Sequence, residues 1–233
     1  MENILTNIRI QINENLYIKD PESSLLGSQI VTHGIQLINS IGFEQFTFKK
    51  LAKRIKSTES SVYRYFENKH KFLLYITSLY WSYMEYRLVI ETNSIEDAYS
   101  KLIKAVEIVT GTPENLSLSL AIDQLALREI VISEFTKAYH NKAVDDENKK
   151  GFFKVYKRLV FRLTKMIENV SENYAYPKSL ASSLIDGALH QHFLAMHFQN
   201  ITDCNTAEKT CEFFKSIVTN QLNITNNEFS RQS

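Results

Sequence analysis

The chain contains 233 residues, 44% of them hydrophobic, with six glycines, three prolines and two cysteines. This length suits one large or two modest domains, and the scarcity of glycine and proline favours an all-α fold over a sheet. The longest unbroken apolar run, Phe72 to Ile76, is too short to cross a bilayer, and the first residues lack a signal-peptide pattern. Two cysteines in so long a chain fit reduced thiols better than a disulfide framework. We therefore expect a soluble, cytoplasmic protein without a membrane segment.

The net charge of +1 conceals an uneven distribution. Residues 24–75 contain eight Lys and Arg against three Asp and Glu, a local charge of +5, so the rest of the chain sums to −4. A basic module joined to a mildly acidic one suggests that the first part meets a polyanion. A solvated basic face without a partner is the alternative that charge alone leaves open.

The first predicted elements are an N-terminal arm and a helix. Residues 1–23 are assigned to the arm, because three isoleucines alternate as in a strand before a turn signal, KDPES. From Ser24 onward the apolar residues recur with a helical period, and Gly42 is well placed to end that helix.

Two short helices are predicted next. Thr47 is placed to cap the first, with the apolar pattern of a hydrophobic staple around it. Thr58 is placed to cap the second, which is expected to run through Phe66. Two short helices joined by a turn of three or four residues form a helix-turn-helix.

The rest of the chain also has helical patterns. Helices are expected over residues 69–92, 115–139, 153–167, 180–198 and 206–222, and a further helix is expected from residue 98. A capping box at 94–97 precedes the helix from 98, Thr112 and Pro113 precede the helix over 115–139, and a break at Tyr176 and Pro177 precedes the helix over 180–198. Residues 142–150 are expected to form a polar loop or an exposed helix end. The expected organisation is an arm (1–23), a helix-turn-helix domain (24–75), a larger helical domain (76–223) and a polar tail (224–233).

The second helix of the predicted helix-turn-helix has two different faces. On a helical wheel, Val62 and Phe66 share one side, which suits packing on the preceding helices. The opposite side carries Ser60, Ser61 and Arg64, with Tyr63 at its edge. Arginine reads guanine, and hydroxyl groups bond bases or phosphates, so this side could enter a major groove. Glu59 lies near the flank, in the first turn, where its charge favours the helix dipole.

At this point the sequence resembles a known family. The segment LAKRIKSTESSVYRYFENKHKFL, Leu51 to Leu73, is similar to the helix-turn-helix of the tetracycline-repressor (TetR/AcrR) family. Residues 24–75 carry this likeness, and the remainder follows only the family's plan of a helical ligand-binding and dimerising domain. The resemblance implies that Tyr63 and Lys69 contact phosphate and that Thr58 and Ser61 lie at the DNA backbone or at base edges.

The segment also departs from the family pattern. Lys56 stands at a turn position where glycine is usual, and Ser57 replaces the apolar residue that follows. A left-handed conformation at Lys56 would cost about 1 kcal/mol. Glu59 stands where a basic or small residue is common, so the base preference cannot be copied from relatives. The complete predicted DNA-contact set is Thr47, Lys56, Thr58, Glu59, Ser60, Ser61, Tyr63, Arg64 and Lys69.

An effector site and a dimer interface are expected in the larger domain because the resemblance implies them. The candidates for the effector site are Trp81, Asp123, Gln124 and Arg128, although such residues more often face solvent or belong to the core. The candidates for the interface are Leu180, Leu184, Ala188, Gln191, Ala195 and Phe198, whose helical spacing suits a four-helix bundle between two chains or the core of one chain.

Metal binding and catalysis have weaker support. Asp186, His190 and His197 form the one metal hypothesis, but contacts across an interface explain them more simply, so no metal and no cofactor is predicted. The sequence lacks a phosphate-binding glycine loop, GxSxG and HExxH, which argues against an enzyme. The predicted function is that of a homodimeric transcriptional repressor that binds double-stranded operator DNA and is released by a small molecule. The alternative is a helical interaction protein of the same fold that has lost DNA binding.

Overall fold

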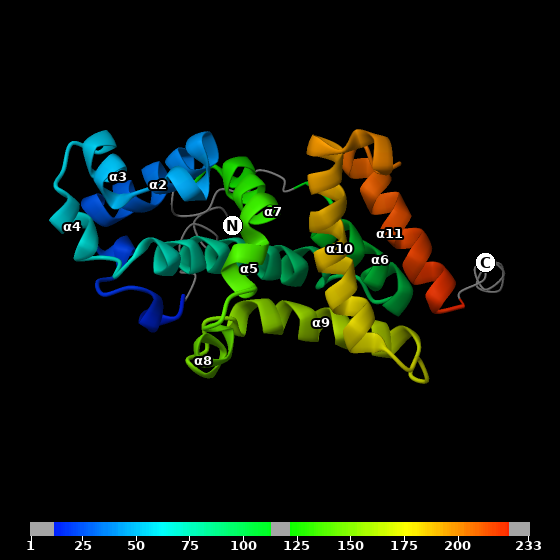
Figure 1. Ribbon diagram of the computed structural model, residues 1–233. Helices are drawn as coiled ribbons and strands as arrows, with labels where there is room; N and C mark the ends of the chain where they lie inside the picture. Colours follow the sequence, from blue (N-terminus) through cyan, green and yellow to red (C-terminus); the bar gives the residue numbers. More distant parts are fainter. Residues whose placement is uncertain (1–11, 113–121, 224–233) are drawn as a thin grey trace. The chain divides into compact units, whose positions relative to one another are not determined.

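The structure is a computed structural model, and it describes residues 12–112 and 122–223. All regular secondary structure in these two ranges is helical, with ten α-helices and three short 3-10 helices. No helix among these residues is long and apolar enough to span a bilayer. Cys204 and Cys211 are free thiols. The all-α prediction is therefore confirmed (Figure 1).

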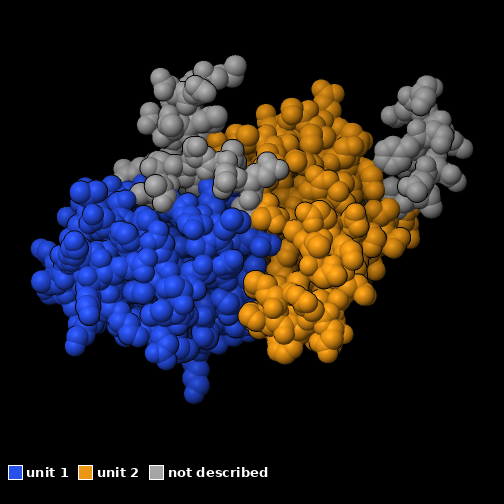
Figure 2. Space-filling model, turned by 90° about the horizontal axis from the view of Figure 1, so that it is seen from above, with its two compact units in different colours: residues 1–83, 113–156 blue, residues 84–112, 157–233 orange. Residues whose placement is uncertain are grey.

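The chain forms two compact units, coloured separately in Figure 2. Unit 1 comprises residues 1–83 and 113–156, and unit 2 comprises residues 84–112 and 157–233. The helix α5, Lys69–Thr92, contributes residues to both units. The domain boundaries expected from the sequence stay predictions.

In unit 1 the first long helix is α2, Leu25–Gln45. Its N-cap is Ser24, whose side chain accepts a hydrogen bond from the Gly27 amide. Gly42 interrupts the helix with a φ of 76°, a left-handed conformation that glycine adopts without a Cβ penalty. The prediction that the first helix breaks at Gly42 is confirmed, although a further short turn continues to Gln45.

Three aromatic rings pack between α2 and the start of α5. Phe46, Phe66 and Phe72 are fully or almost fully buried, and the Phe66 and Phe72 ring centroids lie 4.9 Å apart. Gly34 of α2 lies directly against the Phe72 ring, where any larger side chain would collide with it. This aromatic core holds the helix-turn-helix against α2.

The described part of the N-terminal segment packs within unit 1. It contains the 3-10 helices η1, Glu14–Leu16, and η2, Pro21–Ser23. The Leu16 side chain is completely buried, and the Ile18 amide donates a 2.8 Å hydrogen bond to the Tyr65 carbonyl. The Lys71 ammonium donates to the Asn15 carbonyl at 2.6 Å. Residues 12–23 therefore form a strap that contacts α2, Tyr65 and the start of α5. Most of the predicted strand-like stretch lies outside the described residues.

The remaining helices of unit 1 lie after the gap in the described residues. They are α7, Gln124–Tyr139, which contacts α2, and α8, Val144–Lys149. The prediction of one helix over 115–139 is wrong at its start, because Ile122 and Asp123 are not helical. Asp123 caps α7 instead, with its carboxylate accepting from the Ala126 amide. Pro113, which was predicted to occupy the first position of that helix, lies outside the described residues.

Unit 2 contains α6, Ala98–Thr110, most of α9, Lys154–Val170, and the two final helices α10, Pro177–His197, and α11, Ala207–Gln221. The helices α6, α10 and α11 contact one another. Thr206 caps α11 as expected, but α6 is capped by Asp97, which accepts from the Ser100 amide, and not by the predicted Ser94.

Candidate nucleic-acid interface

The helix-turn-helix consists of α3, Phe48–Arg54, and α4, Glu59–Tyr63. Thr47 caps α3 by accepting from the Lys50 amide, and Thr58 caps α4 by accepting from the Ser61 amide. Both predicted caps are confirmed. The second helix is shorter than predicted: it ends at Tyr63 and not at Phe66, because the chain turns there toward α5.

The turn between the two helices has left-handed backbone at Lys56, with a φ of 54°. The Ser57 amide donates to the Ala52 carbonyl at 2.9 Å, and the Lys56 amide donates to the Lys53 carbonyl at 3.3 Å. This pattern is a Schellman motif, which normally has glycine at the position that Lys56 occupies. Lys56 therefore keeps the left-handed conformation usual for glycine at this position, and its side chain is exposed.

The outward face of α4 is a cluster of hydroxyl groups and one base. The Thr58 hydroxyl lies 3.0 Å from that of Ser60 and 2.8 Å from that of Ser61. Arg64 donates to the Ser61 hydroxyl at 3.3 Å, and its side chain is exposed. Hydrogen-bond donors and acceptors thus lie together at the start and the end of one short exposed helix, the arrangement that base and phosphate contacts need.

The inward face of α4 anchors that cluster to the core. Val62 and Phe66 are fully buried, and the buried Tyr65 shares a 2.7 Å hydrogen bond with the Ser24 hydroxyl. Tyr63 is 46% exposed, with its ring edge-on to Phe48 at 5.0 Å. The Tyr63 ring is therefore held by packing while much of the side chain stays accessible.

Lys69, the first residue of α5, has two carbonyl partners. Its ammonium donates to the carbonyls of Phe43 and Glu44 at 3.2 and 3.3 Å, and it lies 4.7 Å from the centre of the Phe43 ring. Cations near the last carbonyls of a helix are favoured by the helix dipole. Lys69 thus ties the start of α5 to the end of α2, a role that the sequence did not predict.

All nine residues of the predicted DNA-contact set lie between Thr47 and Lys69, on α3, α4, their turn and the first residue of α5. Most of them are exposed, while Glu59, Ser61 and Lys69 are half-buried. The hydroxyls of Thr47 and Thr58 are used as helix caps, so their further contacts must come from the remaining lone pair or the hydroxyl proton.

The four residues proposed for an effector site have different environments in unit 1. Trp81 is buried in an aromatic cluster, with its indole nitrogen donating to the Tyr139 hydroxyl at 2.6 Å. Asp123 is engaged as the α7 cap, and Gln124 is buried beside it. Arg128 is half-buried, burial lowers the pKa of its guanidinium, and one terminal nitrogen has no hydrogen-bond partner among the described residues.

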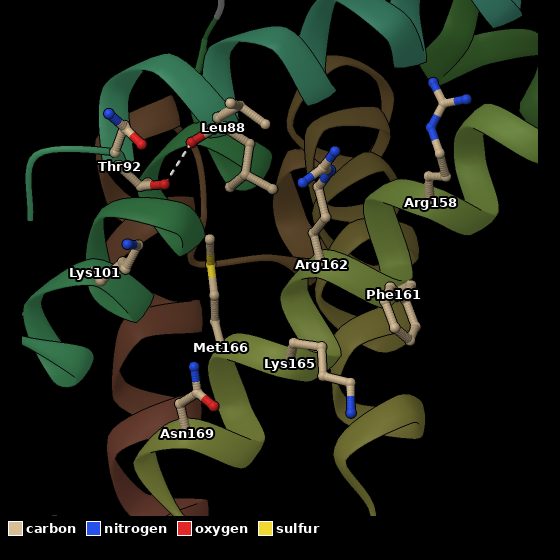
Figure 3. A pocket seen from close by; sticks show the side chains of 11 residues that line it. Leu88, Thr92, Lys101, Arg158, Phe161, Arg162, Lys165, Met166 and Asn169 are labelled. Carbon is tan, nitrogen blue, oxygen red and sulfur yellow. Dashed lines mark hydrogen bonds between the residues drawn. The ribbon is translucent and has the colours of Figure 1, made fainter.

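Unit 2 contains a cavity that the sequence did not predict. Its volume is about 600 Å³, and it lies between α5, α6 and α9 (Figure 3). Leu88 and Thr92 of α5 face Arg162 and Met166 of α9 across the cavity, with Lys101 of α6 at one side. No local signal identifies this site, because α9 is far in the sequence from α5 and α6.

The six residues proposed for a dimer interface divide into two groups. Leu180, Leu184 and Ala188 are buried inside unit 2, where α10 packs on α6 and α11, so these three form core. Gln191 and Ala195 are half-buried, with the Gln191 side chain accepting from the Thr202 hydroxyl at 2.6 Å, and Phe198 is 50% exposed.

The metal hypothesis has no geometric support. Asp186, His190 and His197 do not form a metal-binding group, and the described part of the chain contains no cluster of three His, Cys, Asp or Glu side chains suited to one. The His197 ring instead packs on Phe193 with centroids 4.7 Å apart.

Comparison with known proteins gives both a family and a fold. Residues 30–76 match the family described as "Bacterial regulatory proteins, tetR family". No curated protein sequence matches the chain significantly.

Among solved structures, AibR in complex with isovaleryl coenzyme A and operator DNA is 15% identical, with 83% of this chain and 96% of that chain covered and a TM-score of 0.57. A transcriptional regulator from Saccharomonospora viridis in complex with choline is 17% identical, covering 82% and 93%, with a TM-score of 0.60. The superantigen PfiT is 14% identical, covering 85% and 97%, with a TM-score of 0.56. These similarities establish a shared fold over most of the chain. The segment that contains the helix-turn-helix therefore matches the TetR family of bacterial regulatory proteins, and the whole chain shares its fold with solved transcriptional regulators.

Proposed function

We propose that the chain is a repressor that binds a palindromic operator as a homodimer and is released by a small-molecule effector. The observation that carries this proposal is the outward face of α4. Thr58, Ser60, Ser61 and Arg64 lie together there, on a helix that buried Val62 fixes to the core. Such a face suits the major groove, where arginine and hydroxyl groups read base edges.

The surrounding basic side chains are proposed to position the domain on phosphates. Lys56 extends from the turn, Tyr63 presents its hydroxyl at the end of α4, and Lys69 lies at the start of α5. Phosphate contacts fix register and orientation without reading sequence. Glu59 is half-buried at the first helical position, so it is proposed to stabilise that end of α4 and to influence the neighbouring base.

Dimerisation is proposed through the end of α10, η3 (Gln199–Ile201) and α11. Four apolar side chains are 42–65% exposed there: Met196, Phe198, Ile201 and Phe213. Clustered exposed apolar residues mark association surfaces, and a two-fold pairing would cover the same surface on both chains. A dimer is also what the readout of two half-sites requires.

Release by an effector is proposed because the fold is shared with proteins in complex with isovaleryl coenzyme A and with choline. An effector can weaken operator binding by no more than the difference between its own affinities for the DNA-bound and the DNA-free protein. Arg128 stays a candidate for an effector contact, because one of its guanidinium nitrogens is buried without a hydrogen-bond partner among the described residues.

Selection of bound sequences from random duplex DNA, followed by salt titration of the preferred site, tests operator binding. A palindromic consensus and a steep fall of affinity with salt are expected. The salt slope is the slope of the logarithm of operator affinity against the logarithm of salt concentration. Lys69→Gln is expected to reduce its magnitude by about one, whereas Lys149→Gln, on α8 outside the helix-turn-helix, leaves it unchanged. Absence of any enriched sequence at low salt would contradict the proposal.

The role of Arg64 has a separate test. Arg64→Ala is expected to weaken operator binding by about 1–3 kcal/mol and to relax the preference at one base position. The variant's selected consensus provides the measurement. An unchanged consensus would remove Arg64 from the base-reading residues and leave it a phosphate contact at most.

The second candidate function is an interaction protein of the same fold without DNA binding. One solved structure of the same fold is described as the superantigen PfiT, and a fold does not by itself establish a function. Lys56 and Glu59, which depart from the family pattern, favour this candidate. It predicts no enriched sequence in the DNA selection.

A further inference from the structure

The cavity in unit 2 has an unbalanced charge. Lys101, Arg158, Arg162 and Lys165 are among the eleven residues that line it, and none of those eleven is acidic. Two carboxylates lie next to the lining: Glu85 pairs with both arginines, and Glu168 pairs with Lys165 at 2.7 Å. Two positive charges therefore remain after these carboxylates are counted, and positive charge concentrated in a concave site attracts anions.

The same cavity has apolar walls. Leu88, Val89, Phe161 and Met166 line it, and two of these side chains are unusually accessible, with Val89 37% and Phe161 57% exposed. Its volume of about 600 Å³ lies within the range of small-molecule sites, roughly 300–1,000 Å³. An apolar wall beside an excess of cations suits a ligand with an apolar chain and an acidic head.

Glu85 is the carboxylate that already shares the positive charge of the two cavity arginines. It is 7% exposed on α5. The Arg158 Nε–H is shared between its two carboxylate oxygens at 2.9 and 3.0 Å, and Arg158 Nη2 donates to Oε2 at 2.5 Å. Arg162 Nε donates to Oε1 of Glu85 at 2.8 Å. Burial opposes its ionisation, but these hydrogen bonds outweigh burial and hold the pKa of the carboxyl below its ordinary value. The carboxylate thus already shows that this part of α9 binds an acid.

Donors in the cavity remain available for a second acid. Among the described residues, the terminal nitrogens of Arg162 make no hydrogen bond, and the Lys101 ammonium has no ion-pair partner. Figure 3 shows the Arg162 side chain extending toward Leu88. An arginine that uses only Nε for Glu85 can still offer its terminal N–H groups to a carboxylate or phosphate.

We propose that this cavity binds an amphipathic anion, a linear apolar chain that ends in a carboxylate or a phosphate ester. The chain lies against Leu88, Phe161 and Met166, and the head takes hydrogen bonds from Arg162 and Lys101. This inference rests on the proposed function, because it names the chemical class of the effector.

The proposed site also has a route to the DNA-binding residues. Glu85 belongs to α5, the helix that begins at Lys69 and ends at Thr92 in the cavity wall. An acidic head on Arg162 weakens the hold of α9 on Glu85, and so acts on the helix that carries Lys69. Binding of the anion and binding of the operator therefore oppose each other.

Isothermal titration of the full chain with decanoate, decyl phosphate, decanol and decyltrimethylammonium tests the ligand class. Both anions are expected to bind, while the neutral and cationic analogues with the same chain bind more weakly by about tenfold or more. The stronger of the two anions distinguishes a carboxylate from a phosphate-ester head. Equal binding of decanol and the anions, or binding of the cation alone, would overturn the proposal.

Variants locate the site. Arg162→Gln is expected to weaken binding of the better anion about tenfold or more, and Lys209→Gln, an exposed lysine on α11 outside the cavity, leaves binding unchanged. Glu85→Gln is expected to strengthen binding, since it removes the competing carboxylate. Unfolding curves of each variant confirm that it is folded. Loss of binding in Glu85→Gln while the variant remains folded, or unchanged binding in Arg162→Gln, would place the anion elsewhere.

A DNA-binding assay separates this inference from the proposed function. Decanoate or decyl phosphate is expected to release the selected operator from the wild-type protein but not from Arg162→Gln. Anion binding without operator release would contradict the effector role while the repressor proposal survives. Failure to select any operator would contradict the repressor proposal, and anion binding would then still support the assignment of the cavity.

Discussion

Lys56 offers a direct test of the link between backbone strain and DNA binding. Its φ of 54° costs a side-chain-bearing residue roughly 1–2 kcal/mol, whereas glycine adopts this conformation freely but loses about 0.5–1 kcal/mol more chain entropy on folding. Replacement by alanine and by glycine removes the same charge, so the two variants differ only in these two quantities. We expect Lys56→Gly to be more stable than Lys56→Ala by about 0.5–1 kcal/mol.

Differential scanning calorimetry measures the difference, which corresponds to roughly 1–4 °C in Tm for a chain of this size. A Lys56→Gly variant that is no more stable than Lys56→Ala would refute the strain argument. Both variants are expected to lose about one unit of salt slope in operator binding, because each lacks the same phosphate contact. A slope unchanged in both would show that the ammonium contacts no phosphate.

Two further predictions concern stability. Leu16→Ala, in the strap, should lower the free energy of unfolding by about 2–5 kcal/mol, because the Leu16 side chain is fully buried. Ile18→Ala is the control: Ile18 is 65% exposed, so its replacement should change the free energy of unfolding little. Equal effects of the two variants in urea unfolding would contradict the packing of the strap. The pKa of Glu85 is lower in the folded state than the ordinary carboxyl pKa of 4.5. The contribution of its ion pairs to folding stability is therefore fully present above pH 4.5 and is lost as the pH falls through the lower folded-state pKa. The difference in Tm between the wild type and Glu85→Gln should therefore shrink on acidification, and a constant difference would exclude the ion pairs as its cause.

The DNA-binding domain was predictable because its signals are local. Thr47 and Thr58 cap helices through amides three residues away, and Lys56 occupies a turn whose hydrogen bonds lie within five residues of it. Such interactions depend on the neighbouring sequence, so residue type and spacing identify them. The predicted helix break at Gly42 is confirmed for the same reason, whereas the left-handed conformation of Lys56 was weighed only by its cost and is seen in the structure.

The features that sequence reasoning missed depend on competition or on distant contacts. Ser94 and Asp97 are both acceptable caps by residue type, and the structure uses Asp97. The spacing of Leu180, Leu184 and Ala188 predicts a buried face, but it does not say whether the same chain or a second chain covers it. The cavity requires α6 and α9 to meet, and the strap requires Asn15 to reach Lys71.

The position of Lys69 has a consequence for the entropy of operator binding. A free lysine side chain carries about 2 kcal/mol of rotamer entropy, much of which is lost when it is fixed on a phosphate. The two carbonyls and the Phe43 ring already restrict this ammonium before DNA arrives. A phosphate contact from Lys69 therefore begins from an ordered side chain, and it favours association more than the same contact from the freely exposed Lys56.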